Sequence, residues 1–181
     1  DAVGWLREAL RELMASDGVD GFKFDAGDLR HYCPDDVTMA GAGAVDQCEA
    51  WARLATEFSF NELRACWKMG GQPLSQRLHD KPRIWGHGGL ASLIPEAIAQ
   101  GLIGHSFNCP DMVGGGELSS FRDGSSLDQE LFVRFAQCSA LFPMMQFSLA
   151  PWRVLDEPHF AAVLAAVQTR QALMPYLSTL V

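Results

Sequence analysis

The chain lacks a surplus of basic side chains, a long apolar run and closely spaced cysteines. It has 14 Lys and Arg against 22 Asp and Glu, which gives a formal net charge of −8. Nucleic acids and anionic membranes are bound by clustered cations, so neither is an expected partner, and a neutral substrate is the better expectation. No run reaches the roughly 18 apolar residues that a membrane span requires, so no membrane segment is predicted.

The cysteines and histidines show no spacing typical of a metal site. The five cysteines are scattered without C-x-x-C spacing, which disfavours a disulfide framework or a structural zinc site and favours buried, reduced thiols. The histidines lack i,i+4 pairing and neighbouring acidic clusters, and no phosphate-loop or Rossmann fingerprint occurs. The sequence therefore predicts neither a metal nor a cofactor.

Length and composition indicate one part of a larger α/β domain. The chain has 181 residues, 48% of them hydrophobic, enough for a sizeable core. It starts at Asp1 without a methionine, in an amphipathic helix, and ends at Val181 in another. A complete (β/α)8 barrel needs roughly 250 residues. We therefore expect residues 1–181 to form one partial barrel domain, an internal piece of a larger enzyme.

Periodicity predicts alternating helices and strands without an internal repeat. Gly18 is expected to end the first helix, and Ser126 to cap the helix that follows a Gly- and Ser-rich loop. The expected helices span 3–14, 45–58, 90–101, 127–141 and 158–180; the expected strands span 19–25, 62–67, 73–79 and 104–110; the expected loops span 26–43 and 113–126. This order is typical of a mainly parallel α/β sheet, although the usual helical crossover is missing between 67 and 73.

The most informative segment is Phe22-Lys23-Phe24-Asp25-Ala26-Gly27-Asp28. Apolar and polar residues alternate up to Asp25, and a small, flexible turn follows it. In α/β barrels the carboxyl ends of the strands carry the chemistry. Asp25 is therefore a candidate catalytic carboxylate, although a solvated aspartate at a strand-to-loop junction fits this segment alone.

The segment resembles the nucleophile motif of glycoside hydrolase family 31, and further motifs follow in matching order. They are Asn61-Glu62-Leu63-Arg64, Arg77-Leu78-His79-Asp80, Trp85-Gly86, Ser92-Leu93-Ile94-Pro95, Pro110-Asp111-Met112-Val113-Gly114-Gly115 and Met145-Gln146-Phe147-Ser148 with Pro151-Trp152-Arg153 beyond. Within the family they are most similar to the myogenesis-regulating glycosidase branch. The resemblance implies the middle and later units of a (β/α)8 TIM barrel and a retaining α-glycosidase.

That reaction needs one ionised carboxylate that attacks the sugar and a second carboxyl that first donates and then accepts a proton. The family pattern gives Asp25 the first role. For the second role Asp80 is preferred over Asp111 and Glu117, because Trp85 stands five residues after Asp80 and Arg64 sixteen before it, as in family members. Otherwise Asp80 would simply pair with Lys81 or Arg77. The two aspartates should converge across about 5 to 6 Å.

The resemblance also implies substrate-binding residues. Arg64 would bind sugar hydroxyls or a catalytic carboxylate, unless it forms an interior salt bridge. Trp67 and Trp85 would form apolar walls against the sugar, unless they belong to the core. Lys23 would help to keep Asp25 ionised or would cap a barrel layer, and Asp111 would contact the sugar or brace the site.

Two departures from the family pattern bear on activity. Asp28 replaces a common glutamate, so its hydrogen bond is expected to be lengthened or lost. Ser148 lies near positions where many α-glucosidases of the family carry an arginine and a histidine, which favours an α-galactoside or related α-hexoside. The alternatives are a sugar-binding barrel without turnover and a transglycosylase or lyase on the same scaffold.

Overall fold

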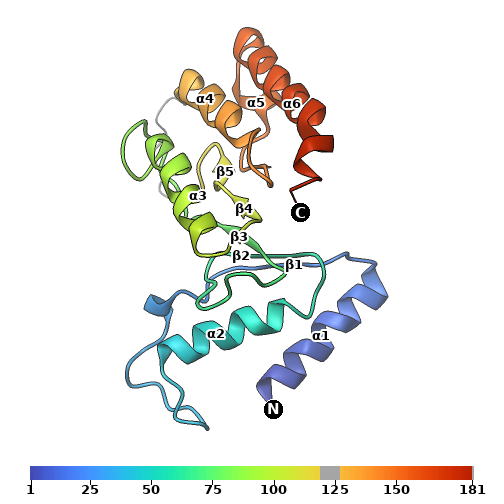
Figure 1. Cartoon of the computed structure of the whole chain (residues 1–181), viewed down its shortest axis with the longest axis vertical. Helices are drawn as coiled ribbons and strands as arrows, with labels where there is room; N and C mark the ends of the chain where they lie inside the picture. Colours follow the sequence, from blue (N-terminus) through green and yellow to red (C-terminus); the bar gives the residue numbers. More distant parts are fainter. Residues whose placement is uncertain (119–126, 181) are drawn as a thin grey trace. The chain divides into compact units, whose positions relative to one another are not determined.

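The computed structural model describes residues 1–118 and 127–180. They divide into two compact units, Asp1–Gln76 and Arg77–Val181, shown in Figure 1. Ser126, the expected helix cap, lies outside the described residues.

The first unit alternates helices and strands as the sequence predicts. Its elements are α1 (Ala2–Asp17), β1 (Phe22–Phe24), the 3-10 turn η1 (Leu29–His31), α2 (Ala44–Ala55), β2 (Asn61–Leu63) and the start of β3 (Ser75–Arg77). The side chain of Asp1 accepts a hydrogen bond from the Gly4 N–H at the start of α1. Gly18 ends the helix at φ 68°, a left-handed conformation that suits glycine. The predicted stop at Gly18 is confirmed.

The strands of this unit run parallel. Phe24 of β1 pairs with Leu63 of β2, and Glu62 of β2 pairs with Ser75 of β3. Residues 64–74, which join β2 to β3, contain turns and bends but no helix. The missing crossover is thus a real feature of this sheet, because β2 and β3 are adjacent parallel strands joined by a short irregular segment.

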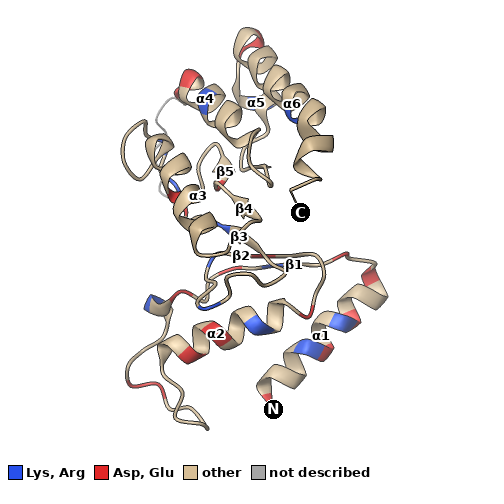
Figure 2. Cartoon of the chain, viewed as in Figure 1, with Lys and Arg blue, Asp and Glu red and all other residues tan. Residues whose placement is uncertain are grey.

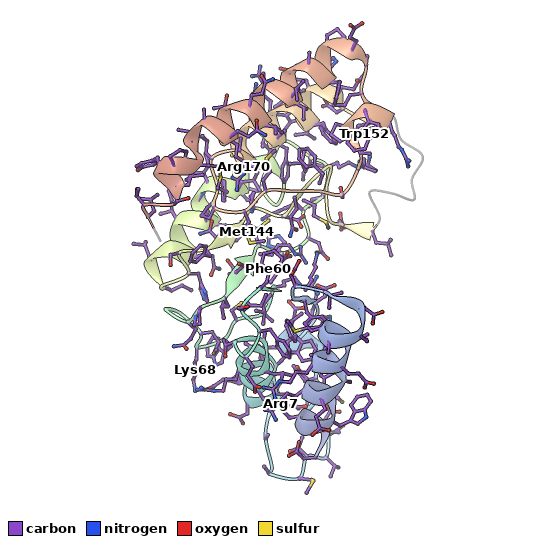
Figure 3. All side chains as sticks on the ribbon, turned by 90° about the vertical axis from the view of Figure 1, so that its right-hand side faces the viewer. Arg7, Phe60, Lys68, Met144, Trp152 and Arg170 are labelled. Carbon is purple, nitrogen blue, oxygen red and sulfur yellow. The ribbon has the colours of Figure 1, made fainter. Side chains whose placement is uncertain are left out.

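Helices α1 and α2 cover one side of these strands (Figure 1), and an apolar core fills the space between them. Phe24, Leu54, Phe58 and Leu63 are buried there, and the Trp51 ring packs edge-on against Phe24 with centroids 5.5 Å apart. Charged residues follow the outer faces of α1 and α2 (Figure 2). On this surface Arg7, labelled in Figure 3, donates two hydrogen bonds of 2.7 Å to the carboxylate of Glu57.

The second unit contains short strands between longer helices. Its elements are η2 (Leu90–Ser92), α3 (Leu93–Leu102), β4 (Asn108–Cys109), β5 (Met112–Val113), α4 (Gln129–Ser139), β6 (Gln146–Phe147), α5 (Pro151–Val154) and α6 (Glu157–Leu177). β5 and β6 pair in parallel, with Val113 opposite Phe147. The predicted helices and the mainly parallel arrangement are confirmed.

Three local expectations in this unit were wrong. The loop expected from Val113 starts later, because Val113 ends β5, and β6 and α5 were not predicted. Strands of two residues are too short for a period-2 pattern to appear in the sequence. The helix expected from residue 127 begins at Gln129, and its cap is Asp128, whose carboxylate accepts the Leu131 N–H at 2.9 Å.

Helices α4 and α6 pack side by side in Figure 1 around a core that includes Phe132, Phe135 and Val163. Arg170, labelled in Figure 3, extends from α6 and donates to the carbonyl oxygens of Phe142 and Pro143. It thereby satisfies carbonyl groups just beyond the end of α4.

The cysteines differ in exposure. Cys48 and Cys109 are buried, Cys66 and Cys138 are half-buried, and Cys33 is exposed in the loop after η1. The expectation of a buried thiol is wrong for Cys33, because this residue lies in an exposed stretch, 33–37. In residues 1–118 and 127–180, no helix is both long and apolar enough to cross a membrane.

Candidate active site

In the first unit, the carboxyl ends of β1 and β2 bring Asp25 and Arg64 together. The pairing of Phe24 with Leu63 places the next residue of each strand at the same sheet edge. The Arg64 Nη1 lies 3.6 Å from the Asp25 Oδ1, and the Asp25 side chain is 59% exposed. Asp25 is therefore accessible, with a nearly buried guanidinium beside it.

Asp28 joins the same cluster through the turn that follows Asp25. Ala26 and Gly27 have φ values of 58° and 75°, and a Cβ on Gly27 would lie 2.4 Å from the Trp51 Cδ1. The turn brings the Asp28 carboxylate to Arg64, whose Nε and Nη2 donate to it at 3.1 and 2.8 Å. The expectation of a lengthened or lost bond was wrong, because the backbone turn compensates for the shorter side chain.

Two other predicted residues of this unit lie near the same sheet. The Lys23 Nζ is 3.6 Å from the Glu62 Oε1, its cross-strand neighbour. The cation that the structure places beside Asp25 is Arg64. That Lys23 helps to keep Asp25 ionised stays a prediction. Trp67 is 47% exposed, so the core alternative is wrong for Trp67, and its contact with a sugar stays a prediction.

In the second unit, Asp80 follows β3 and pairs with Arg77. The Arg77 Nη1 donates to the Asp80 Oδ1 at 2.9 Å, and the Asp80 side chain remains 36% exposed. The alternative partner, Lys81, turns away toward α3. Asp80 thus combines one fixed oxygen with access from solvent, as a proton-transfer residue requires.

Asp111 lies beneath this pair and is fully buried. Its carboxylate accepts from the Arg77 Nη1 at 2.6 Å and from the Lys81 N–H at 2.8 Å. A Cβ on Gly116 would lie 2.5 Å from the Asp111 Oδ2, so only glycine fits there. These are the contacts of a residue that braces the site, while its predicted contact with the sugar stays a prediction.

The buried Arg77 and Asp111 charges influence one another. Burial raises the pKa of Asp111, although the Lys81 N–H and Arg77 both act to lower it. Burial acts to lower the pKa of Arg77, but Asp111 and Asp80 outweigh it and raise that pKa. Arg77 is therefore a permanent cation shared by two carboxyl groups.

Trp85 stands outside the core and is held by a residue that the site prediction missed. Its side chain is 46% exposed, and its indole Nε1 donates to the Asp128 Oδ2 at 2.8 Å. The core alternative is therefore wrong for Trp85 as well. An aspartate directly before an amphipathic helix is a capping signal, but it does not reveal the second bond to Trp85.

The structure thus forms two acidic clusters, Asp25–Asp28–Arg64 in the first unit and Arg77–Asp80–Asp111 in the second. Each holds one solvent-accessible candidate catalytic carboxylate beside a buried or nearly buried arginine. The separation between Asp25 and Asp80 stays a prediction. Among the described residues, no three His, Cys, Asp or Glu side chains are arranged to hold a metal ion.

Parallel strands that are followed by aspartates, together with helices that pack beside them, are typical of part of an α/β barrel enzyme. Residues 83–180 match the glycosyl hydrolases family 31 TIM-barrel domain. The chain belongs to this family, as its motifs predicted.

Curated relatives agree with this assignment. The chain is 34% identical over 163 residues to the myogenesis-regulating glycosidase of Mus musculus, and 41% identical over 161 residues to the SITS-binding protein of Tetronarce californica. Each match covers 84% of this chain and 22% of the relative, so the chain spans about a fifth of the length of these proteins. The predicted similarity to the myogenesis-regulating branch is confirmed.

A solved structure shows the same fold. A family 31 sulfoquinovosidase from E. rectale, in complex with an aza-sugar inhibitor, superposes with a TM-score of 0.74 at 20% sequence identity. The match covers 97% of this chain and 29% of that chain. The partial TIM barrel predicted from the sequence is confirmed.

Proposed function

We propose that the protein containing this chain is a retaining α-glycosidase that hydrolyses terminal α-linked hexosides by double displacement. Asp25 is the nucleophile and Asp80 the general acid/base. The observation that carries this proposal is the environment of Asp25, an exposed carboxylate at a strand end with Arg64 at 3.6 Å. The carboxyl ends of barrel strands carry the chemistry in α/β barrels, and Asp25 lies at such an end.

Asp80 suits the role of general acid/base. It must start protonated, donate to the departing oxygen and then accept a proton from water. Its neighbour Arg77 is also bonded to Asp111 at 2.6 Å, so the charge of the guanidinium is divided between two carboxyl groups. The Asp80 side chain is also 36% exposed, so a substrate and water can reach it.

For the substrate we propose an α-galactoside or a related α-glucoside. Ser148 supports this choice, because its hydroxyl donates to the Val113 carbonyl at 3.1 Å. This short side chain is engaged with the backbone of β5 and does not replace the histidine of many α-glucosidases of the family. An α-sulfoquinovoside belongs in the same assay, since the structural relative is named as a sulfoquinovosidase.

A second candidate is a sugar-binding barrel without turnover. The relative named SITS-binding protein, at 41% identity, carries a name that refers to binding and not to hydrolysis, which motivates this candidate. The replacement of the family's glutamate by Asp28 suggested a site without activity. Asp28 nevertheless accepts two hydrogen bonds from Arg64, which disfavours this candidate.

The experiment uses the full-length protein with a panel of aryl α-glycosides, followed by anomer-resolved NMR. We expect the α-anomer as the first product; a β-anomer, a transfer product or an unsaturated sugar would replace the proposal by inversion, transglycosylation or elimination. Binding without any cleavage would establish the second candidate.

The Asp80→Ala variant tests the acid/base assignment. It should lose cleavage of poor leaving groups, whereas on activated aryl glycosides azide, which needs no general base, should speed the second displacement and give an α-glycosyl azide. The control is Asp35→Ala, an exposed aspartate of the loop 26–43, which should behave as wild type. Undiminished cleavage of poor leaving groups by Asp80→Ala would remove Asp80 from its role.

A further inference from the structure

Lys81, the residue directly after Asp80, is a fully buried lysine. A buried ammonium is costly unless it is paired and hydrogen-bonded. The Lys81 Nζ donates to the Ser92 Oγ at 2.8 Å and to the Glu96 Oε2, and it lies 3.5 Å from the His79 Nε2. Its partner Glu96 is partly exposed, so the ion pair could form nearer to solvent. The full burial of the Lys81 ammonium therefore indicates a role for Lys81 in this position.

The backbone of Lys81 is anchored as firmly as its side chain. Its N–H donates to the Asp111 Oδ2 at 2.8 Å, and its carbonyl accepts from the Gly116 N–H at 3.1 Å. Every polar group of this residue therefore has a partner in a different segment from the one that carries Asp80.

Asp80 itself is bound differently. The Asp80 Oδ1 accepts a hydrogen bond from the Arg77 Nη1 at 2.9 Å, and Arg77 stands four positions before Lys81 in the same segment. Arg77 and the Lys81 N–H both bind the Asp111 carboxylate. Both ends of the segment 77–81 are thus bound to the buried Asp111 carboxylate. At the Lys81 end, the lysine side chain also binds η2 and α3.

We infer that Lys81 is a positioning residue for the general acid/base: its buried ammonium, bound to Ser92 and Glu96, fixes the backbone from which Asp80 reaches the leaving-group oxygen. This inference rests on the proposed function. Proton transfer requires a donor within about 2.6 to 3.2 Å, and a misplacement of about 1 Å costs on the order of a hundredfold in rate. A rigid anchor at the neighbouring residue therefore serves the acid step directly.

The test is Lys81→Met in the full-length protein, which keeps the length of the side chain and removes its charge. Cleavage of an α-glycoside with a poor leaving group depends on protonation by Asp80, and its kcat should fall about 10- to 100-fold. An activated aryl glycoside with a good leaving group leaves without protonation, so its glycosylation step should change little. Lys81→Arg should restore part of the loss.

Two further variants keep the result interpretable. Lys68→Met makes the same substitution at a lysine that is 61% exposed and should match wild type on both substrates. Glu96→Gln loosens the ion pair without placing a new group in the interior, and it should show the same leaving-group dependence in weaker form if Lys81→Met fails to fold.

Equal losses on both substrates in Lys81→Met and Glu96→Gln would show a merely structural role and overturn the inference. Asp80→Ala separates this outcome from failure of the proposed function. If Asp80→Ala shows leaving-group dependence and the Lys81 variants do not, only the positioning role is wrong; if Asp80→Ala shows none, the acid/base assignment is wrong as well.

Discussion

Replacing Asp111 by Asn should release the segment that carries Asp80. Asn has nearly the same volume but no charge, so the Arg77 guanidinium, whose side chain is 2% exposed, loses its buried counter-ion. Removal of one partner from a buried ion pair costs about 3 to 5 kcal/mol. Because 1.4 kcal/mol is a factor of ten, local opening should become at least about a hundredfold more frequent.

Hydrogen exchange followed by mass spectrometry of the full-length protein measures this effect locally. Peptides covering 77–82 and 108–117 should exchange at least about a hundredfold faster in Asp111→Asn, while peptides of α2 should keep their wild-type rates. The control is Asp35→Asn, which makes the same change of charge at an exposed site.

The double variant Arg77→Met/Asp111→Asn removes the buried cation together with its buried counter-ion. Its peptides 77–82 should therefore exchange more slowly than those of Asp111→Asn alone. A change of less than tenfold in Asp111→Asn, or a double variant that exchanges faster than either single one, would refute the reasoning that this pair braces the segment.

Two predictions concern other titratable groups. The Leu131 N–H and the Trp85 indole lower the pKa of Asp128 from its ordinary 3.8, so its stabilising effect is complete above pH 3.8 and is lost as the pH falls through the lower folded-state value. Asp128→Ala should cost about 1 kcal/mol through loss of the cap and should remove the contribution of Asp128 to the acid unfolding transition; an unchanged acid transition would contradict it. Burial raises the pKa of the Cys66 thiol to about 12, so a thiolate-specific reagent at pH 8 should label exposed Cys33 rapidly and leave Cys66 unmodified, and equal labelling in peptide mapping would contradict the burial.

The sequence predicts the Asp25 cluster better than the Asp80 cluster, for a physical reason. Asp25 and Arg64 each follow a strand, and parallel strands bring their carboxyl ends to one edge, so their proximity follows from local patterns. Asp28 was misjudged because side-chain length alone ignores the left-handed turn at Ala26 and Gly27.

The bracing of Asp80 depends on contacts between distant positions. Asp111 lies 30 residues beyond Lys81, whose N–H it accepts, and it follows a two-residue strand that no periodicity reveals. Lys81 reads as a charged loop residue in the sequence, whereas the fold buries it against Ser92 and Glu96. Such sites become visible only once the neighbouring elements are placed.

The most direct measurement of the central claim is covalent trapping of the sugar on the full-length protein. A 5-fluoro-α-galactosyl or 5-fluoro-α-glucosyl fluoride should accumulate as a glycosyl-enzyme, because the ring fluorine slows both displacements while the good fluoride leaving group keeps the first one fast. Peptide mass spectrometry should find the sugar on Asp25 in wild type and no adduct in Asp25→Asn. A sugar attached to another residue, or turnover without any covalent adduct and with inverted product, would contradict double displacement through Asp25.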